Sequence, residues 1–392
     1  MRRLYLFNPE SDLALANNDE NYMPPQSARK LAKDLALLPL WYAEEDSLIL
    51  AESYPNTEYL EWIQSILPIK VDLLTYPEAS HLSDIQLSPW GWNKAINKFF
   101  KQLGLNTYCP TDDYLSALRH LTRRDMAARL LKHLPKYDFI CGSSQILMSK
   151  PDLESFHSVN DSFILKAPIS GSGKGLKWCR RGLDEAALKW FNRTIAQQDS
   201  AIGEPIYSKE LDFAMEFEII SSSEIHFIGY SSFETNANGA YIGNKLISDV
   251  SFLEGIERKY GLKEALLQIQ RDIEKLVLQF YGTDYRGCLG VDMMVCQFES
   301  YPCFRIHPCV EVNLRMNMGI LAHQLYHRYI DCNSTGIYKI DYSKKMDVLY
   351  QQHLRMQKKY PLVIKEGKIV EGYLALCPVT RQSQYHAWIL IE

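Results

Sequence analysis

Hydrophobic residues in the first third of the chain alternate between short apolar runs and longer stretches with helical spacing. The apolar runs cover residues 3–7, 47–52 and 71–76, and each has the length of a buried strand. Between them, residues 27–42 and 58–67 repeat apolar side chains at three- and four-residue intervals, which predicts amphipathic helices. This alternation of strands and helices predicts a parallel α/β domain at the N-terminus.

Two polar loops follow predicted strands of this domain, at residues 8–25 and 88–93. Ligands of open α/β sheets bind beyond the carboxyl ends of the strands, so both loops are candidate substrate loops. Glu10 and Asp12 in the first loop are suited to hold the positive charge of an amine, and the tryptophans of the second are suited to exclude water. Ordinary turns rich in Asn, Pro and Asp are the alternative interpretation.

The rest of the chain mixes helices with longer strands, so the sequence predicts an α/β domain followed by α+β structure. We place domain boundaries near residues 115 and 203, which gives predicted domains at 1–115, 116–203 and 204–392. The expected elements are a helical stretch at 112–134, a strand at 163–166, a helix at 183–198, a β-rich segment at 204–220, a polar stretch at 231–245, a helix at 262–281, a hairpin at 287–313, a helix at 319–330 and a last strand at 387–392.

Composition narrows the class of protein. A chain of 392 residues with 46% hydrophobic and 23% charged residues is that of a globular protein with more than one domain. Its net charge of −4 gives no reason to expect a nucleic-acid or anionic-membrane partner. The apolar runs are too short to span a membrane, and the N-terminus has no signal-peptide pattern. Nine cysteines without any C-x-x-C spacing indicate reduced thiols, and we expect a cytoplasmic protein.

Residues 163–177, FILKAPISGSGKGLK, place a lysine at the end of a predicted strand and a glycine-rich loop directly after it. Backbone N–H groups of such a loop and a nearby ammonium group suit phosphate binding. The Walker A pattern fails because Pro168 and Gly175 stand at two of its required positions, and the dinucleotide pattern fails at Leu176. We expect Lys166 to lie beneath phosphates that the loop covers. A flexible surface turn is the alternative.

The hairpin at 287–313 holds a second candidate site. A simple antiparallel register around its turn places Asp292 opposite Glu311, with Asn313 on the same face as Glu311. Facing carboxylates repel one another unless a cation lies between them. Oxygen ligands of this kind suit Mg²⁺. A one-residue bulge would spoil this register. Two solvated carboxylates are the alternative, which the apolar neighbours VDMMV and CVEV disfavour.

This ordered set of parts resembles the ATP-grasp superfamily over residues 116–325. The resemblance implies a two-lobed ATP-grasp fold that follows the α/β domain. This fold would hold ATP between its lobes and contact the phosphates with basic side chains. Arg124 stands where the family usually has a phosphate-binding lysine, and Lys166 matches the second lysine. The phosphate-covering loop would comprise Ser170, Gly171, Ser172, Gly173, Lys174 and Gly175.

The resemblance also implies the remaining ligand contacts. Glu204, Pro205 and Ile206 match the hinge that pairs with adenine, and Asp212 is placed to bind the ribose hydroxyls. The implied metal is Mg²⁺, bound as two ions. Mn²⁺ is the alternative metal. Its ligands would be the hairpin residues Asp292, Glu311 and Asn313.

The segment 311–315, EVNLR, is similar to the E-x-N-x-R motif of biotin carboxylase and glycinamide ribonucleotide synthetase. D-alanine–D-alanine ligases have an arginine where Gly290 stands, so the resemblance favours the E-x-N-x-R branch. It assigns Arg315 to stabilise the oxyanion and Lys166 to hold transferring oxygens. Lys245, after the polar stretch, would reach the γ-phosphate on closure.

The implied activity is ATP-dependent ligation of a carboxylate to an amine or similar nucleophile through an acyl phosphate, releasing ADP and phosphate. A small-molecule kinase and a non-catalytic nucleotide-binding regulator are the alternatives. The expected partners are small-molecule carboxylates and amines; a homodimer is one option for the oligomeric state. His323 and His327 form the pair HQLYH, but Gln324 stands where a metalloprotease needs glutamate, so we expect ordinary histidines there.

Overall fold

The computed structural model describes residues 1–171, 175–236 and 239–392. Three residues of the predicted phosphate loop, Ser172, Gly173 and Lys174, therefore lie outside the described part of the chain. The chain forms two compact units. Unit 1 comprises Met1–Leu115, Ile242–Ser248 and Met316–Glu392, and unit 2 comprises Ser116–Tyr241 and Asp249–Arg315.

These units agree with the sequence at one boundary and differ at another. The division after Leu115 coincides with the predicted end of the first domain. Residues 316–392, which the sequence analysis placed in the last domain, belong to unit 1 instead. The reason is a set of long-range contacts that local patterns do not encode, such as the hydrogen bonds from Trp41 Nε1 to the Leu376 carbonyl at 2.8 Å and from the Tyr59 hydroxyl to the Ala375 carbonyl at 2.6 Å.

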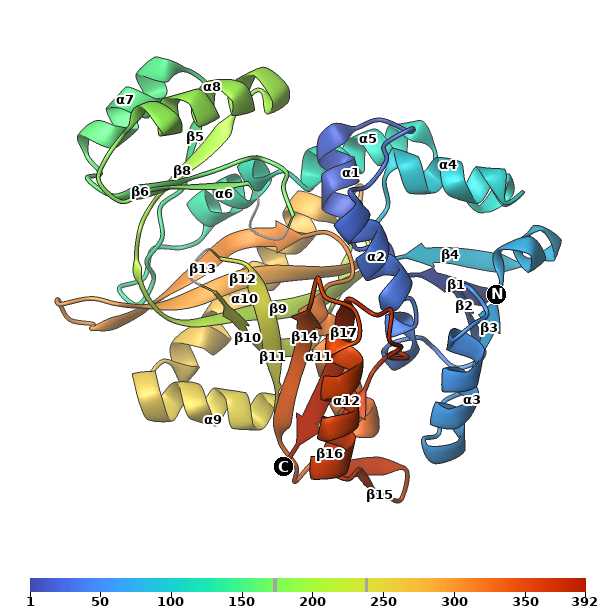
Figure 1. The fold of residues 1–392 in the computed structure, drawn as a ribbon. Helices are drawn as coiled ribbons and strands as arrows, with labels where there is room; N and C mark the ends of the chain where they lie inside the picture. The colour runs from blue at the N-terminus through green and yellow to red at the C-terminus, as the bar shows by residue number, and fades with distance from the viewer. Residues whose placement is uncertain (172–174, 237–238) are drawn as a thin grey trace. The chain divides into compact units, whose positions relative to one another are not determined.

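Unit 1 contains the predicted parallel α/β sheet, in the strand order β3-β2-β1-β4 (Figure 1). Its core is formed by Leu4, Leu6, Leu48 and Leu50 from the strands, with Phe100 packed against them. The strands are β1 (Arg2–Leu6), β2 (Ser47–Leu50), β3 (Val71–Leu74) and β4 (Ile85–Pro89). The helices are α1 (Ser11–Asn17), α2 (Gln26–Asp34), α3 (Asn56–Ile66) and α4 (Lys94–Gln102), with short 3-10 turns at Leu38–Trp41, Tyr76–His81 and Asn106–Tyr108.

The later segments of unit 1 form antiparallel strands that run in the order β11-β14-β17-β16-β15. Tyr338, Ile389 and Leu374 are buried in this layer. The strands are β11 (Tyr241–Leu246), β14 (Gly336–Tyr342), β15 (Val363–Lys365), β16 (Lys368–Ala375) and β17 (Tyr385–Ile391). Two helices accompany them, α11 (Met318–Tyr329) and α12 (Val348–Lys359).

A buried histidine and a partly buried one in unit 1 share one tyrosine hydroxyl. The Tyr373 hydroxyl lies 2.7 Å from His386 Nε2 and 2.8 Å from His353 Nδ1. Burial lowers the pKa of His353 to about 4, and burial together with His353 lowers the pKa of His386 to about 3. Both rings are therefore neutral in the folded protein at neutral pH.

We expect the free energy of unfolding to fall as the pH drops from about 6.5 toward 3, by about 1.4 kcal/mol for each unit of histidine pKa difference. The unfolded chain takes up protons at these rings before the folded chain does, so stability is complete above the unfolded pKa. His386→Leu should flatten the pH dependence, as followed by urea unfolding. The control is His226→Gln, which replaces an exposed histidine. If the free energy of unfolding depends on pH equally in the two variants, the prediction is wrong.

Unit 2 contains two sheets. The first, in the order β5-β8-β6-β7, is flanked by two helices, and Phe156, Phe163 and Phe191 fill its core. Its strands are β5 (Gln145–Leu147), β6 (Phe163–Lys166), β7 (Leu176–Cys179) and β8 (Ala201–Pro205), and its helices are α7 (Lys150–Ser158) and α8 (Glu185–Gln198).

The second sheet of unit 2 is antiparallel, in the order β13-β12-β9-β10. Helix α10 buries one side chain per turn, from Leu266 through Ile273 to Tyr281, which is the predicted amphipathic pattern. The strands are β9 (Ser208–Ser221), β10 (Glu224–Thr235), β12 (Gly287–Gln297) and β13 (Phe304–Asn313), and the helices are α9 (Asp249–Tyr260) and α10 (Lys263–Tyr281).

The single helical stretch predicted at 112–134 is two helices, α5 (Asp112–Leu121) and α6 (Arg124–His133). The chain breaks between them because the backbone N–H of Arg124 donates to the carbonyl of Pro168 at 2.9 Å instead of continuing α5. Among the described residues, no helix is long and apolar enough to cross a membrane.

Candidate active site

A buried ion pair joins two strands of the first sheet in unit 2. Lys166 Nζ lies 2.5 Å from Glu204 Oε2, and the two side chains are 7% and 5% exposed. The Ser144 hydroxyl donates to the other oxygen of Glu204 at 2.6 Å. Burial opposes ionisation of Glu204, but the Lys166 charge and these hydrogen bonds hold the pKa of its carboxyl below the ordinary value. Lys166 is thus a fixed, charged group at the end of β6.

Arg124, the first residue of α6, connects the glycine-rich loop with the hairpin. Its guanidinium lies 2.7 Å from Glu311 Oε1 and donates to the Ala167 carbonyl at 2.7 Å and to the Ser170 hydroxyl at 2.8 Å. The side chain is almost completely buried. The predicted phosphate contact of Arg124 stays a prediction; in this structure the guanidinium neutralises one carboxylate of the predicted metal site.

The ends of the glycine-rich loop lie close together. Ala167 N donates to the Gly175 carbonyl at 2.8 Å. A Cβ added at Gly175 would stand 2.2 Å from the Ser170 side chain, so only glycine fits at that close approach. The described residues Ser170, Gly171 and Gly175 therefore position the loop directly after Lys166.

The predicted carboxylate pair faces across the hairpin, since Asp292 pairs with Glu311 in the β12–β13 ladder. Asn313 Nδ2 donates to Asp292 at 3.1 Å, and Arg315 Nη2 donates to Asn313 Oδ1 at 3.2 Å. Burial, with the negative charges of Glu311 and Glu216, raises the pKa of Asp292 well above its ordinary value. Such a concentration of negative charge in oxygen ligands fits a divalent cation.

The register that creates this pair is not the simple one that the sequence analysis assumed. Near the hairpin tip, Cys296 pairs with Arg305, a register that would not bring Asp292 opposite Glu311. From Asp292 to Met294 strand β12 advances two residues, while β13 advances four from His307 to Glu311. The bulge contains Pro308, which has no N–H to give to a ladder. The facing pair is confirmed, but a bulge produces it.

A cavity of about 450 Å³ in unit 2 is lined by eight of the predicted site residues. Its lining includes Lys166 and Arg124, the carboxylates Asp292 and Glu311, and side chains of the predicted hinge. Asp212 also lines the cavity; Lys209 and the Thr235 hydroxyl donate to its carboxylate. The predicted lining residues are Arg124, Lys166, Glu204, Pro205, Ile206, Asp212, Asp292 and Glu311. This volume is in the range of small-molecule sites.

Several lining residues were missed by the sequence analysis. Trp178 and Arg180 stack, with the Arg180 guanidinium 4.8 Å from the centre of the Trp178 ring. The alternation of side chains along β7 could have indicated these residues, because it places Leu176 and Trp178 on the same face of the strand. Tyr207 and Lys209 come directly after the predicted hinge, and no local pattern indicated that they would face the cavity.

Lys245 lies in unit 1, on β11, where it pairs with Ile337 of β14 and its side chain is exposed. Its predicted contact with the γ-phosphate stays a prediction.

Among the residues of the N-terminal loops, the tryptophans differ from the expectation. Asn8 is buried, donates to the Gly91 carbonyl at 2.7 Å and accepts from Gly91 N at 3.3 Å, so it joins the two loops. Trp90 packs against Phe7 with ring centres 5.1 Å apart, and Trp92 packs against Phe100. The tryptophans are therefore parts of the core and do not wall a substrate site.

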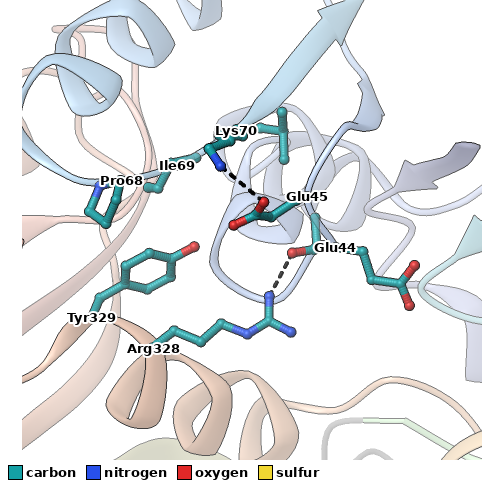
Figure 2. A pocket seen from close by; sticks show the side chains of 9 residues that line it. Glu44, Glu45, Pro68, Ile69, Lys70, Arg328 and Tyr329 are labelled. Atoms are coloured by element: carbon teal, nitrogen blue, oxygen red, sulfur yellow. Dashed lines mark hydrogen bonds and ion pairs between the residues drawn. The ribbon is translucent and has the colours of Figure 1, made fainter.

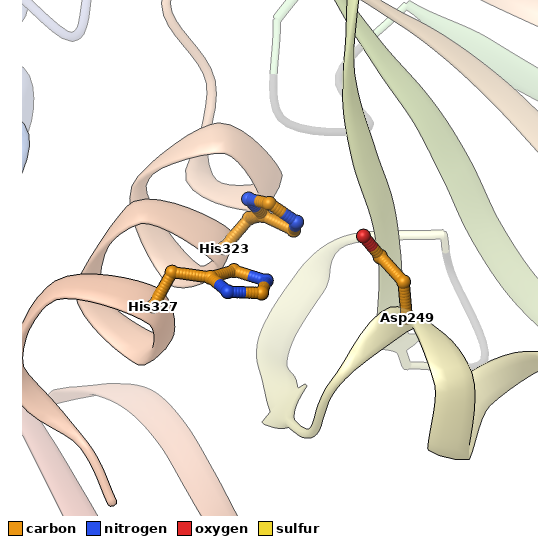
Figure 3. A group of neighbouring side chains, drawn as sticks. All are labelled: Asp249, His323 and His327. Atoms are coloured by element: carbon orange, nitrogen blue, oxygen red, sulfur yellow. The ribbon is translucent and has the colours of Figure 1, made fainter. Parts of the chain in front are cut away.

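Figure 3 shows His323 and His327 on one face of α11. Their ring centres lie 4.2 Å apart. Gln324 lies between them in sequence, so the metalloprotease pattern is incomplete, as the sequence indicates.

Comparison with solved structures identifies the fold. The chain is similar to N5-carboxyaminoimidazole synthetase from Staphylococcus aureus, solved with ADP (12% identity, TM-score 0.51, covering 100% of this chain and 93% of that one). Biotin carboxylase from Campylobacter jejuni is also similar (10% identity, TM-score 0.53, covering 100% and 87%). A third is the biotin carboxylase domain of Hydrogenobacter thermophilus 2-oxoglutarate carboxylase, solved with MgADP and bicarbonate (11% identity, TM-score 0.51, covering 99% and 85%).

No protein-family model matches the sequence, and no curated protein matches it. The structural similarity covers the whole chain, whereas identity is between 10% and 12% in these three comparisons. The chain therefore has the ATP-grasp fold, and the sequence prediction of that fold is confirmed.

Proposed function

We propose that this protein, an ATP-grasp chain, is an ATP-dependent ligase that joins a carboxylate to an amine or similar nucleophile. The observation that carries the proposal is the cavity of unit 2, where two cationic side chains and a facing carboxylate pair line the same space. A site that only binds nucleotide has no need of two facing carboxylates, because the pair repels phosphate unless metal is present.

Nucleotide binding is assigned to residues that line this cavity. The adenine would pair with the chain at Glu204–Ile206, and Asp212 would accept hydrogen bonds from the ribose hydroxyls once Lys209 turns away. Lys166 and Arg124 would neutralise phosphate oxygens. Both cations are bound to carboxylates in this structure, so phosphate would replace Glu204 and Glu311 as their partners.

Divalent metal would be held by Asp292, Glu311 and Asn313, whose oxygens and mutual repulsion fit Mg²⁺. When bound, Mg²⁺ would neutralise phosphate charge and orient the transferring group. Once Arg124 binds phosphate, Glu311 would be left free for the metal. The same movement would therefore assemble both halves of the site.

The proposed reaction has two steps. A carboxylate oxygen attacks the γ-phosphorus and the bond to the bridging oxygen breaks, which gives an acyl phosphate and ADP. The amine nitrogen then attacks the acyl carbon, loses its proton to solvent and expels phosphate. Lys166 and Arg124 stabilise charge in the first step, and Arg315 stabilises the oxyanion in the second.

We expect ADP release from ATP and Mg²⁺ only when a carboxylate and an amine are supplied together. A screen of small carboxylates and amino acids, singly and in pairs, with a coupled ADP assay measures this. ADP release with one compound alone would identify a kinase instead. Tight ATP binding without turnover in any mixture would favour a nucleotide-binding regulator.

A matched variant makes the screen specific to the site. Arg315→Met should lower the turnover number by about 100-fold with little change in nucleotide affinity, because it removes charge that acts only on the reacting carbonyl. Arg286→Met, whose guanidinium donates to the Gly282 and Tyr285 carbonyls, is the control. Equal turnover in wild type and Arg315→Met would remove Arg315 from the catalytic assignment.

A further inference from the structure

Unit 1 contains a cavity of about 530 Å³ at the carboxyl ends of β1 and β2, where Leu6 and Leu50 form part of its floor. Ligands of parallel α/β sheets bind at this edge. Five of its lining residues are aromatic, and two of them, Tyr76 and Phe99, meet edge to face with ring centres 5.8 Å apart. Tyr54 also lines it, with 70% of its surface exposed. An exposed aromatic wall around a concave space favours a ligand with an apolar body.

Four charged side chains line this cavity, and they divide into two groups. Lys33 and Glu52 form an ion pair with 2.7 Å between Nζ and Oε2, so they neutralise each other. Glu10 and Arg29 have no such partner. Among the described residues, no side-chain hydrogen bond or ion pair is made by the Arg29 guanidinium, and the buried Oε2 of Glu10 has no hydrogen-bond partner.

The isolation of Glu10 is not explained by local structure. Glu10 precedes α1 at the N-cap position, yet its side chain makes no capping hydrogen bond. Burial raises the pKa of its carboxyl, offset only by its own backbone N–H, so the anionic form lacks stabilisation in the free protein. Burial is the main cause that raises the pKa of Tyr22, and the charge of the Glu10 carboxylate is the second cause. Glu10 and Tyr22 therefore lie near each other, and both line the cavity. A cation from a ligand would supply the missing partner.

A second cavity of unit 1 provides a contrast. It has a volume of about 460 Å³. Figure 2 shows four of its lining residues, Glu45, Lys70, Arg328 and Tyr329. There the charged groups already have partners: Lys70 lies 3.1 Å from Glu45, and the Arg328 guanidinium donates to the Ala43 carbonyl at 2.6 Å and to the Gln324 side chain at 3.0 Å. Glu44 pairs with Arg3 at 3.1 Å, so each charged side chain that lines this cavity already has a hydrogen-bond or ion-pair partner. The unmatched pair belongs to the cavity that contains Glu10.

We propose that the Glu10 cavity binds a small zwitterion with a bulky apolar group, of which apolar α-amino acids are the simplest members. The ligand's ammonium group pairs with Glu10, its carboxylate pairs with Arg29, and its side chain packs against the aromatic wall. This binding needs no nucleotide, so it stands or falls separately from the proposed ligase activity.

Isothermal titration of the full chain without nucleotide tests the ligand. The probes are L-phenylalanine, L-leucine and L-tyrosine, with glycine, N-acetyl-L-phenylalanine and L-phenylalaninamide as decoys. At least one apolar amino acid should bind about tenfold more tightly than glycine, and blocking its amine should weaken binding by about tenfold or more. Blocking its carboxylate should weaken binding by a few-fold, because Arg29 is exposed. No binding of any of the three, or equal binding of the N-acetyl derivative, would overturn the proposal.

Variants test the assignment of the two charges. Glu10→Gln should weaken amino-acid binding by about tenfold or more, and Arg29→Gln by a few-fold, whereas Glu58→Gln and Arg193→Gln, at exposed positions away from the cavity, should leave it unchanged. If the Glu10→Gln variant binds N-acetyl-L-phenylalanine as tightly as it binds L-phenylalanine, that result supports the pairing of Glu10 with the ligand's ammonium group. Unchanged amino-acid affinity in a folded Glu10→Gln variant would overturn this pairing. If the variant does not fold, the titrations of the wild type with the decoy compounds test the pairing instead.

Discussion

Asp292→Asn and Glu311→Gln are each expected to reduce the rate of ATP-dependent ADP release by about 100-fold or more. The two carboxylates face each other in the β12–β13 ladder, and both line the cavity. A neutral amide cannot compensate the charge of a divalent ion, so each substitution would remove much of the metal affinity. The measurement is the coupled ADP assay across a range of Mg²⁺ concentrations, with the carboxylate–amine pair that the screen identifies.

A second measurement separates a lost metal site from a damaged fold. In metal-free buffer, Asp292→Asn should unfold at no lower temperature than the wild type, because it removes a buried carboxylate that lies beside Glu311 and Glu216. Added Mg²⁺ with nucleotide should raise the unfolding temperature of the wild type only. Glu299→Gln, at the exposed tip of the same hairpin, should behave as wild type. Mg²⁺-dependent turnover at the wild-type rate in Asp292→Asn would remove Asp292 from the metal site.

Lys166→Met is expected to lower the free energy of unfolding by about 3–5 kcal/mol and to weaken ATP binding by at least about tenfold. The loss of stability follows from the burial of Glu204, which would keep its negative charge without the ammonium group 2.5 Å away. The loss of ATP affinity follows from the position of Lys166 in the cavity, where it would meet phosphate. Urea unfolding and calorimetric titration with ATP measure the two effects separately.

The double variant Lys166→Met/Glu204→Gln resolves the two roles. It should recover most of the lost stability, because no unpaired charge remains buried, but it should not recover ATP affinity. The control pair is Lys189 and Glu185 on α8, which lie 2.6 Å apart with side chains 74% and 80% exposed. Lys189→Met should cost about 0.5 kcal/mol or less. Wild-type ATP affinity in the double variant would mean that the Lys166–Glu204 pair is purely structural.

Local patterns were sufficient for the elements and for several site residues. Strand-length apolar runs predicted β1, β2 and β3, and helical spacing predicted α3 and α10, because each pattern depends on neighbours a few residues apart. The lysine before the glycine-rich loop and the carboxylates of the hairpin were readable for the same reason. Lys166, Asp292 and Glu311 do line one cavity, as their resemblance to a known arrangement implied.

Long-range pairing was beyond these patterns. The sequence did not predict that residues 316–392 belong with the first 115 residues, because the contacts that join them, such as those of Trp41 with Leu376 and of Tyr59 with Ala375, link distant parts of the chain. The sequence also contained no sign of the break before Arg124. That break depends on a hydrogen bond to Pro168, which lies more than forty residues further along the chain but close by in the tertiary structure. Contacts of this kind carry no local signal.

By itself, the sequence determined where strands, helices and chemically distinctive side chains occur, because periodicity and turn chemistry act over a few residues. Only the tertiary structure decided how charges are matched. It pairs Lys166 with Glu204 and Arg124 with Glu311, and it leaves the buried Oε2 atom of Glu10 without a hydrogen-bond partner. It also brings Asp292 opposite Glu311 through a bulge. Matching depends on distance and on exclusion of water, and both are fixed only when separate segments pack together.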